Sequence, residues 1–500
     1  MFASARERSE LWSGLRPGRH HATSAVAGHP GGVKVWQAVS ICEMMIAKEL
    51  HAEMHKGRFL RCSYVEHLPQ LLHDPQIDGD RQHAEKRRDQ SHEGDESPSP
   101  RPEPVDHRAD IHRPDCAGRA AAGAQEAGVD EVWFSTSHTH SGRWLVSTPT
   151  PERPYTDELE WDELTEKGPI AERPEELQWN NGVHQAIDEI VAEAQRNMVP
   201  VDLRAGRASV QVGFNRRLAA ADGSVYMGVN RDGPVVPWVN VLSAHARDTG
   251  KPIAIYFEHA AHPVTVPHGS NLVSADFPGA AVRRIHKHLG DDVIALFGQG
   301  CSGNVNSFPL RSTHADADAA GHKLGEAVLQ AMVQSNVLKS TKLKLKTVVT
   351  ELPTRPLPPL ELVESLLQDN RRDARRLKQL GKIKTVLLRG GAPPSRRFEV
   401  HGVMIGEEWC LVGLNYELFA QIELWVAKVA PFRWTMVNSL TNGGRAYLGD
   451  DEALALGPKG GYEAGSLPSW SGHETMSPSL GPPAVGCEAI VKKAIVGLWS

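Results

Sequence analysis

The sequence predicts an α/β fold, a layered mixed β-sheet with flanking helices, plus a poorly structured N-terminal segment. The first observation is the order of elements between residues 251 and 300. An apolar strand, a polar loop, a helix, a second strand and a glycine-rich turn follow one another there, as in α/β layers. The second is size, because 500 residues of which 40% are hydrophobic can bury a large core. The third is a change in composition near residue 117.

Residues 1–116 form an atypical segment that is rich in His, Arg and Pro and has almost no sustained helical or strand periodicity. From Gln82 to Pro114 the composition cannot bury enough apolar surface to offset the loss of chain entropy, so we expect disorder. An exception is Val35 to Glu53, which could form one amphipathic helix. Alternatively, a shifted reading frame or a wrong start places this segment out of register with the rest, and the protein then lacks part of its sheet.

The ordered elements are expected in residues 117–499. An alanine-rich helix over 117–128 leads into a strand over 129–142, and the polar stretch 153–177 reads as a surface loop or lid. The helices predicted after it are Val183–Asn197, one opened by Pro278 and closed by Gly290, Asp316–Val333, Leu360–Leu380 and a closing helix over Ala489–Trp499. The predicted strands are Leu203–Arg217, Pro252–Pro263, Asp291–Gly300, Lys342–Val349 and one from Phe432. A hairpin over Phe398–Phe419 is expected to turn at Gly406–Glu408.

Composition excludes several classes of protein. A formal charge of -6 over 500 residues gives no reason to expect nucleic acid or an anionic membrane as a partner. The 6 cysteines are widely spread without a Cys-x-x-Cys pair, which argues against a zinc knuckle and against a dense disulfide framework. No apolar run approaches the roughly 20 residues of a membrane span, and the N-terminus lacks a signal pattern. As written, the chain is expected to be soluble and cytoplasmic, or secreted if its true N-terminus differs.

A pair of histidines, His138 and His140, follows the apolar residues Val132 to Phe134. Residues two apart on a strand point to the same side, so both imidazoles are expected to project together from a strand end. Neutral imidazole is the commonest protein ligand for metals, although two hydrogen-bonded polar histidines are the alternative. Ligands of α/β folds collect at the carboxyl ends of strands, where His138, His262 and the turn at Gly298 are all expected.

Several motifs occur along residues 117–499 in the order found in one family of hydrolases. They are HTHSG (138–142), NRR (215–217), HAAHPV (259–264) with NLVSADFPG (271–279), GQGCSGNVN (298–306), GLNYELF (413–419), NGGRAYLG (442–449) and GGYEAGS (460–466). In this set and order the chain resembles the neutral/alkaline non-lysosomal ceramidase family. It is most similar to the short bacterial relatives, because it leaves no room for the C-terminal immunoglobulin-like domain.

The resemblance implies a zinc hydrolase domain over residues 117–499 that cleaves an amide (N-acyl) bond with a metal-activated water. The substrate would be a small or lipid-like N-acyl compound. Matched position by position, the implied zinc ligands are His138, His262, Glu417 and Tyr447. In the same matching, His140, Arg216 and Tyr462 orient or polarise the scissile carbonyl.

Gly444 replaces the first tyrosine of the family's Tyr-x-x-Tyr pattern, and a second departure bears directly on the chemistry. The glycine-rich turn of ceramidases carries a serine regarded as the nucleophile, and the matching residue here is Asn306. An amide cannot act as a nucleophile, but it can donate a hydrogen bond to an oxyanion. We therefore expect zinc-activated water to attack, with Asn306 among the catalytic residues. The alternative is an inactive relative that binds zinc and a lipid or sugar-like ligand.

Overall fold

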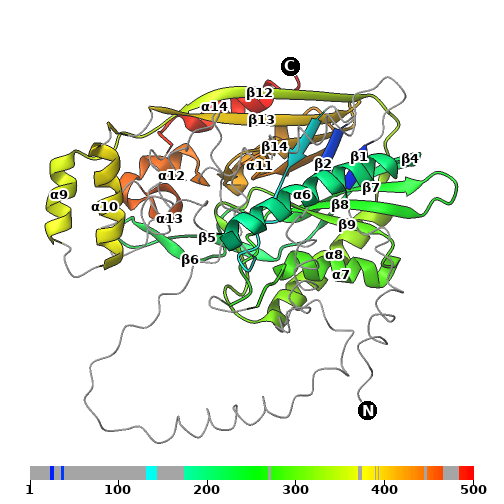
Figure 1. The fold of residues 1–500 in the computed structure, drawn as a ribbon, viewed down its shortest axis with the longest axis horizontal. Coiled ribbons are helices and arrows are strands. Elements are labelled where there is room, and N and C mark those ends of the chain that lie inside the picture. The colour runs from blue at the N-terminus through cyan, green and yellow to red at the C-terminus, as the bar shows by residue number, and fades with distance from the viewer. Residues whose placement is uncertain are drawn as a thin grey trace, which may run out of the picture.

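The structure is a computed structural model. The residues that it describes are 23–26, 35–38, 131–142, 174–267, 272–369, 374–388, 390–391, 394–443, 447–465 and 483–500. Two β-sheets lie face to face in the middle of the molecule, and helices cover the outer face of each (Figure 1). This arrangement confirms the predicted mixed α/β architecture of strands with flanking helices. The strands, however, form several separate sheets instead of the single layered sheet that the sequence predicted.

The first sheet has five strands. In spatial order they are β11 (Asn336–Val337), β4 (Val201–Ser209), β7 (Trp238–Ala246), β8 (Pro252–His259) and β9 (Ile294–Gln299). Neighbours are antiparallel except β8 and β9, which are parallel and are joined through helix α7 (Asp276–Leu289). Helix α7 and helix α8 (His314–Val333) pack together against one face of this sheet.

The second sheet has four strands. They are β12 (Leu343–Pro353), β13 (Ser395–Ile405), β14 (Trp409–Leu414) and β16 (Trp434–Asn438). Here β14 and β16 are the parallel pair, and helix α11 (Ala420–Val429) lies in the connection between them. Helix α11 and helix α14 (Cys487–Val496) contribute to the apolar layer on the outer face.

Strand β8 shows how the sequence produces this layering. Ile255 and Phe257 pack toward α7 and α8, whereas Tyr256 between them packs into the layer shared by the two sheets. Both faces of the strand are covered, so its residues form a continuous apolar run instead of alternating with polar ones. Strand β14 follows the same rule, with Val412 facing the helices and Leu411 facing the other sheet.

The described residues form three smaller sheets besides these two. They are β1 (Thr23–Val26), β2 (Val35–Ala38) and β3 (Glu131–Phe134); β10 (Val305–Ser307), β5 (Gly213–Ala219) and β6 (Val225–Asn230); and the pair β15 (Glu417–Leu418) and β17 (Tyr447–Leu448). The other helices within the described ranges are α6 (Pro174–Arg196), α9 (Leu360–Asp369), α10 (Ala374–Leu388), α12 (Asp451–Ala455), the 3₁₀ turn η3 (Gly457–Lys459) and α13 (Gly461–Ala464).

Several predicted elements need correction, among them the hairpin over Phe398–Phe419, whose second strand ends at Leu414, so that Glu417 belongs to a separate sheet. Residues 203–217 form two strands, β4 and β5, which belong to different sheets. The single helix predicted over Leu360–Leu380 is divided into α9 and α10. Helix α6 begins at Pro174, nine residues before the predicted Val183. Val35–Ala38 form strand β2 instead of the start of a helix.

Some expectations fall on residues outside the described ranges. These are the helix over 117–128, the polar stretch 153–173, the rest of the helix predicted up to Glu53, and the disorder expected over 82–114. Within the described residues, no helix combines the length and the apolar character needed to cross a membrane.

The contact between α7 and α8 depends on a glycine. A β-carbon on Gly321 of α8 would lie 2.3 Å from the β-carbon of Ala280 and 2.4 Å from the carbonyl oxygen of Phe277, both on α7. The two helix backbones can approach this closely only because no side chain lies between them.

We expect Gly321→Ala to lower the free energy of unfolding by roughly 1–3 kcal/mol through overpacking of this contact. The matched control is Gly381→Ala in α10, where a β-carbon meets nothing within 4 Å. That change should leave stability unchanged or raise it by up to about 1 kcal/mol, because alanine favours helix. Urea denaturation of the two variants measures the difference, and equal effects would contradict this packing argument.

Candidate functional site

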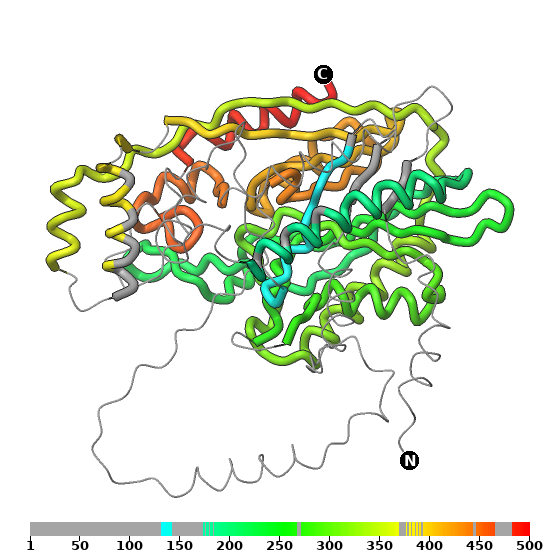
Figure 2. Tube along the Cα trace, viewed as in Figure 1, coloured from blue at the N-terminus to red at the C-terminus, as the bar shows by residue number. Residues whose placement is uncertain are grey.

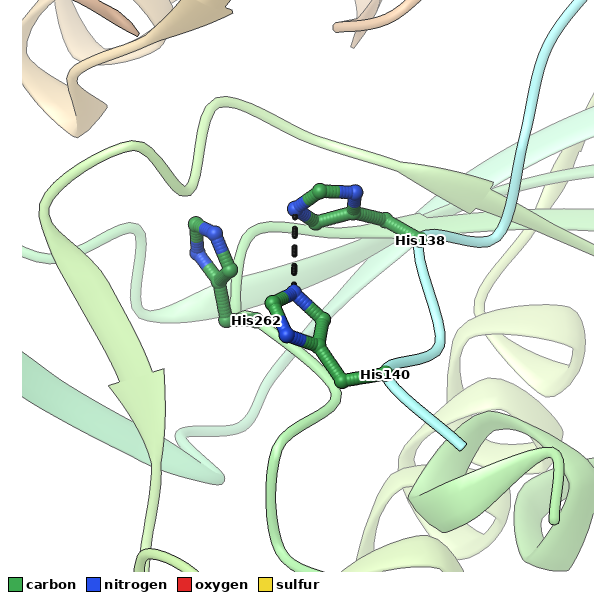
Figure 3. Close-up of side chains that lie close together, drawn as sticks. All are labelled: His138, His140 and His262. Atoms are coloured by element: carbon green, nitrogen blue, oxygen red, sulfur yellow. Dashed lines mark hydrogen bonds between the residues drawn. The ribbon is translucent and has the colours of Figure 1, made fainter. Parts of the chain in front are cut away.

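The two histidines of the HTHSG motif lie in the loop after β3, not on the strand itself. His138 has a left-handed backbone (φ 59), so the side chains do not alternate as on a strand, yet their Nε2 atoms are 3.4 Å apart (Figure 3). Residues 131–142, cyan in Figure 2, run between the two parts of the molecule formed by the main sheets. The loop is anchored at one end by Asn442, which bonds to Phe134, and at the other by the carbonyl of Pro263.

His262 lies three residues after β8 and completes a cluster with these two histidines (Figure 3). The potential ligand atoms of His138, His140 and His262 all lie within 4.8 Å of one another. His138 and His262 are buried, and His140 is half-buried. The Nδ1 atom of His262 donates to the carbonyl oxygen of Ser302 at 2.7 Å, which fixes the tautomer with a free lone pair on Nε2.

Glu417 and Tyr447 reach the cluster from the parallel strands β15 and β17. They are direct partners in the strand register, so their side chains project to the same side. Oε2 of Glu417 lies 3.0 Å from Nε2 of His262 and 3.3 Å from Nε2 of His138. The Tyr447 hydroxyl lies 3.3 Å from Nε2 of His262.

Burial and neighbouring charges set the protonation of these groups. Burial, followed by the nearby Arg216 charge, lowers the pKa of His262 to about 4, so its imidazole is neutral. Burial alone would raise the pKa of Glu417, but His138 and His262 outweigh it and hold the pKa well below the usual value. A neutral imidazole and an ionised carboxylate are the forms in which these residues bind metal ions.

The distances fit a small metal ion. Ligand atoms about 2.0–2.2 Å from a tetrahedral ion are about 3.3–3.6 Å from one another. The donor atoms of His138, His262, Glu417 and Tyr447 lie 3.0–3.3 Å apart in the measured pairs. The described residues therefore include a buried group that can bind a metal ion, with His140 at its edge.

Arg216 lies on β5 beside the cluster and is buried. Its guanidinium donates to three acceptors, namely Oε1 of Glu463 at 2.7 Å, Oδ1 of Asn306 at 2.9 Å and the carbonyl oxygen of Gly303 at 2.7 Å. Burial would lower its pKa, but Tyr447 and Glu463 outweigh this effect and raise the pKa above the usual value. Arg216 therefore remains a fixed positive charge.

Asn306 lies on β10 between His262 and β5. It pairs with His262 through an isolated β-bridge and with Phe214 in the strand register, so these side chains share one face. Because its Oδ1 accepts from Arg216, the Nδ2 group is the end of the amide that is not committed to the guanidinium. Asn306 thus supplies an oriented donor next to the cluster.

Tyr462 lies on the short helix α13 and is half-buried. Its ring centroid is 5.7 Å from that of Tyr447, and the Arg216 guanidinium carbon lies 5.4 Å from the Tyr462 ring and 5.1 Å from the Tyr447 ring. All eight residues singled out in the sequence are thus brought together. Their individual roles stay predictions.

Glu463 was missed by the sequence analysis. It accepts from Arg216 through Oε1 and from Arg217 through Oε2 at 2.6 Å, and so compensates two largely buried cations. The signal was present, because two adjacent arginines near a buried site require an acidic partner and Glu463 stands next to Tyr462.

The comparisons with known proteins are limited. No protein-family model and no curated protein matches the chain. Among solved structures, neutral ceramidase from Pseudomonas aeruginosa is similar at 16% identity and a TM-score of 0.49, covering 71% of this chain and 61% of that one. A ceramidase complexed with C2 is similar at 15% identity and a TM-score of 0.47, covering 73% and 63%. The chain spans less than two thirds of either structure.

We expect Glu463→Ala to lower the free energy of unfolding by roughly 3–5 kcal/mol, because it leaves the buried Arg216 without a counter-charge. Asp202→Ala is the control, since its ion pair with Arg247 is exposed and should contribute no more than about 1 kcal/mol. Chemical denaturation of both variants measures the contrast. A loss at Glu463 as small as that at Asp202 would contradict the proposed charge compensation.

Proposed function

We propose that residues 117–499 form a zinc-dependent hydrolase domain that cleaves the amide bond of a linear N-acyl substrate. The observation that carries the proposal is the convergence of two imidazoles, the ionised Glu417 and the Tyr447 hydroxyl beside a buried guanidinium and an oriented amide. Such a site combines metal-binding groups with hydrogen-bond donors at the position of a polarised carbonyl.

His138, His262, Glu417 and Tyr447 would hold the zinc ion, since their donor atoms lie 3.0–3.3 Å apart in the measured pairs and both imidazoles are buried. When bound, zinc lowers the pKa of water from about 15.7 toward about 7, which provides a nucleophile at neutral pH without a serine. Asn306 at the position of the family's serine is compatible with this chemistry, because its role would be to donate a hydrogen bond.

Asn306 and Arg216 would stabilise the negative charge that develops on the carbonyl oxygen. The measured nitrogens of Arg216 are each committed to a protein acceptor, so the guanidinium acts mainly through Asn306 and through its positive field. The Asn306 Nδ2 group donates to the oxyanion, and the hydroxyl of the half-buried Tyr462 is a second donor. Such donors typically contribute about 10²–10³ in rate.

His140 would transfer the proton to the leaving amine. It is half-buried, unlike His138 and His262, so it stands between the buried metal-binding group and solvent. A group that exchanges protons with both substrate and water needs this intermediate position.

Zinc binding is tested with His262→Ala and Glu417→Ala. Each variant should bind at least tenfold less zinc than the wild type in metal analysis of the purified full chain, since each loses one buried donor. His245→Ala on β7 is the control and should keep full zinc. Full zinc occupancy in both site variants would overturn the assignment.

The role of His140 is tested with His140→Gln. We expect zinc content to remain at the wild-type level while kcat for N-acyl 4-nitroanilides falls by about 10²–10⁴, as for loss of a general acid–base group. Loss of zinc in this variant would instead identify His140 as a metal ligand. Zinc binding by the wild type without turnover of any amide or ester would favour the alternative of an inactive, ligand-binding protein.

A further inference from the structure

We propose that Glu258 and Glu423 form a proton-sharing carboxyl pair that positions the glycine-rich turn behind the candidate site. The turn is defined as residues 300–304. Glu258 lies on β8, four residues before His262, and Glu423 lies in the first turn of α11, six residues after Glu417. Neither carboxyl group has a role in the chemistry proposed above.

Both glutamates are removed from water. Their exposed fractions are 0% for Glu258 and 1% for Glu423. They come from different layers, because β8 belongs to the first sheet and α11 to the outer face of the second. Two buried carboxyl groups in such a place must be compensated by cations, hydrogen bonds or protons.

The two carboxyl groups meet at Gly300. A β-carbon on this residue would lie 2.3 Å from Oε1 of Glu258 and 2.8 Å from Oε2 of Glu423. The turn is therefore in direct contact with both acids, and only glycine fits between them.

One oxygen of each acid accepts a hydrogen bond. Oε2 of Glu258 accepts from the Asn240 side chain at 2.7 Å, and Oε2 of Glu423 accepts from the backbone N–H of Cys301 at 2.9 Å. Within the described part of the chain, the Oε1 atom of each acid has no hydrogen-bond partner of normal geometry, and the backbone of Val437 is a further weak donor near Glu258. The carboxyl groups also interact directly with each other, so a proton on one of them supplies the hydrogen-bond donor that the surrounding residues do not provide.

The charged and titratable groups that face the pair support this state. Among the described residues, Arg207 on β4 is the cation, and its Nε donates to Asn240. Burial raises the pKa of Glu258 to about 7, and burial together with the Glu258 charge raises the pKa of Glu423 well above its usual value. The pKa of the neighbouring Cys301 thiol is also raised, so it stays neutral. Glu423 therefore holds its proton at neutral pH.

The turn connects this pair to the candidate site. Its carbonyl oxygens accept from the site residues, Ser302 from His262 and Gly303 from Arg216. The other side of the turn is hydrogen-bonded to the segment that begins with Glu417. The backbone N–H of Gly303 donates to the carbonyl oxygen of Leu418. The Asn304 side chain accepts from the backbone N–H of Ala420 and donates to the Gln421 side chain. A shift of the turn would thus displace His262 and Arg216 together.

The direction of the pH effect follows from the raised pKa values. The folded state binds protons that the unfolded state, with the glutamate pKa near its ordinary value of 4.5, releases. The stability contributed by the pair is complete below that unfolded pKa, and it is lost as the pH rises through the folded pKa of Glu258, about 7.

The test measures the thermal unfolding midpoint of the full chain, freed of metal with a chelator, between about pH 5 and pH 8.5. We expect the wild-type midpoint to fall over this range relative to that of Glu423→Gln, which removes one titrating carboxyl but keeps a donor. Glu326→Gln, at an exposed site on α8, should keep the wild-type pH dependence. A Glu423→Gln curve parallel to the wild type would overturn the proposal.

Glu258→Gln is the second variant, should Glu423→Gln fail to fold, and the same difference from the wild type is expected. An activity measurement on the zinc-loaded protein rests on the proposed function. There the alkaline limb of the kcat profile for an N-acyl 4-nitroanilide should move up by at least about one pH unit in the Gln variant, with KM unchanged. If no form of the protein shows turnover, the proposed function fails, and the stability curves still decide on the carboxyl pair.

Discussion

The rest of the site depends on keeping the Glu417 carboxylate ionised where water is excluded. A charge in such surroundings is tolerated only with compensating partners. His138 supplies the largest compensation for the Glu417 charge, and the positive Arg216 lies close to His262. Glu463 then balances Arg216, so that charges of opposite sign alternate across the site. This alternation fixes the side chains more firmly than packing alone, because a displaced partner leaves an uncompensated charge.

The two main sheets provide the frame for this charge pattern. Each contains one parallel pair, β8 with β9 and β14 with β16, with a helix in the connection. Because each such unit ends its strands toward the same region, His262 comes from one sheet and Glu417 from beyond the end of the other. Arg207 joins them further back, since it belongs to β4 and donates to the carbonyl oxygen of Thr435 on β16. The distances between the site residues therefore depend on how the two sheets pack against each other.

Much of the fold could be predicted from the sequence, because helices such as that from Pro278 to Gly290 carry both periodicity and end signals. The division of residues 203–217 into two sheets could not, since the apolar alternation continues across the break. The site residues were found through motif order, whereas the left-handed backbone of His138 is set by tertiary contacts. Glu258 was missed because one acid within an apolar strand reads as part of the strand, and only the folded chain brings Glu423 to it.

The hydrogen bonds of the site join residues that are far apart along the chain. Glu417 and His262 are separated by 155 residues, Tyr447 and His262 by 185, and the bond that anchors the loop of His138 spans 308. Closing loops of this size costs chain entropy that no short segment can recover by itself. The group that could bind a metal ion is accordingly a property of the completed chain. A fragment containing only one of its histidine motifs has no means of preforming it, so a metal ion bound to this group would show that the chain has folded completely.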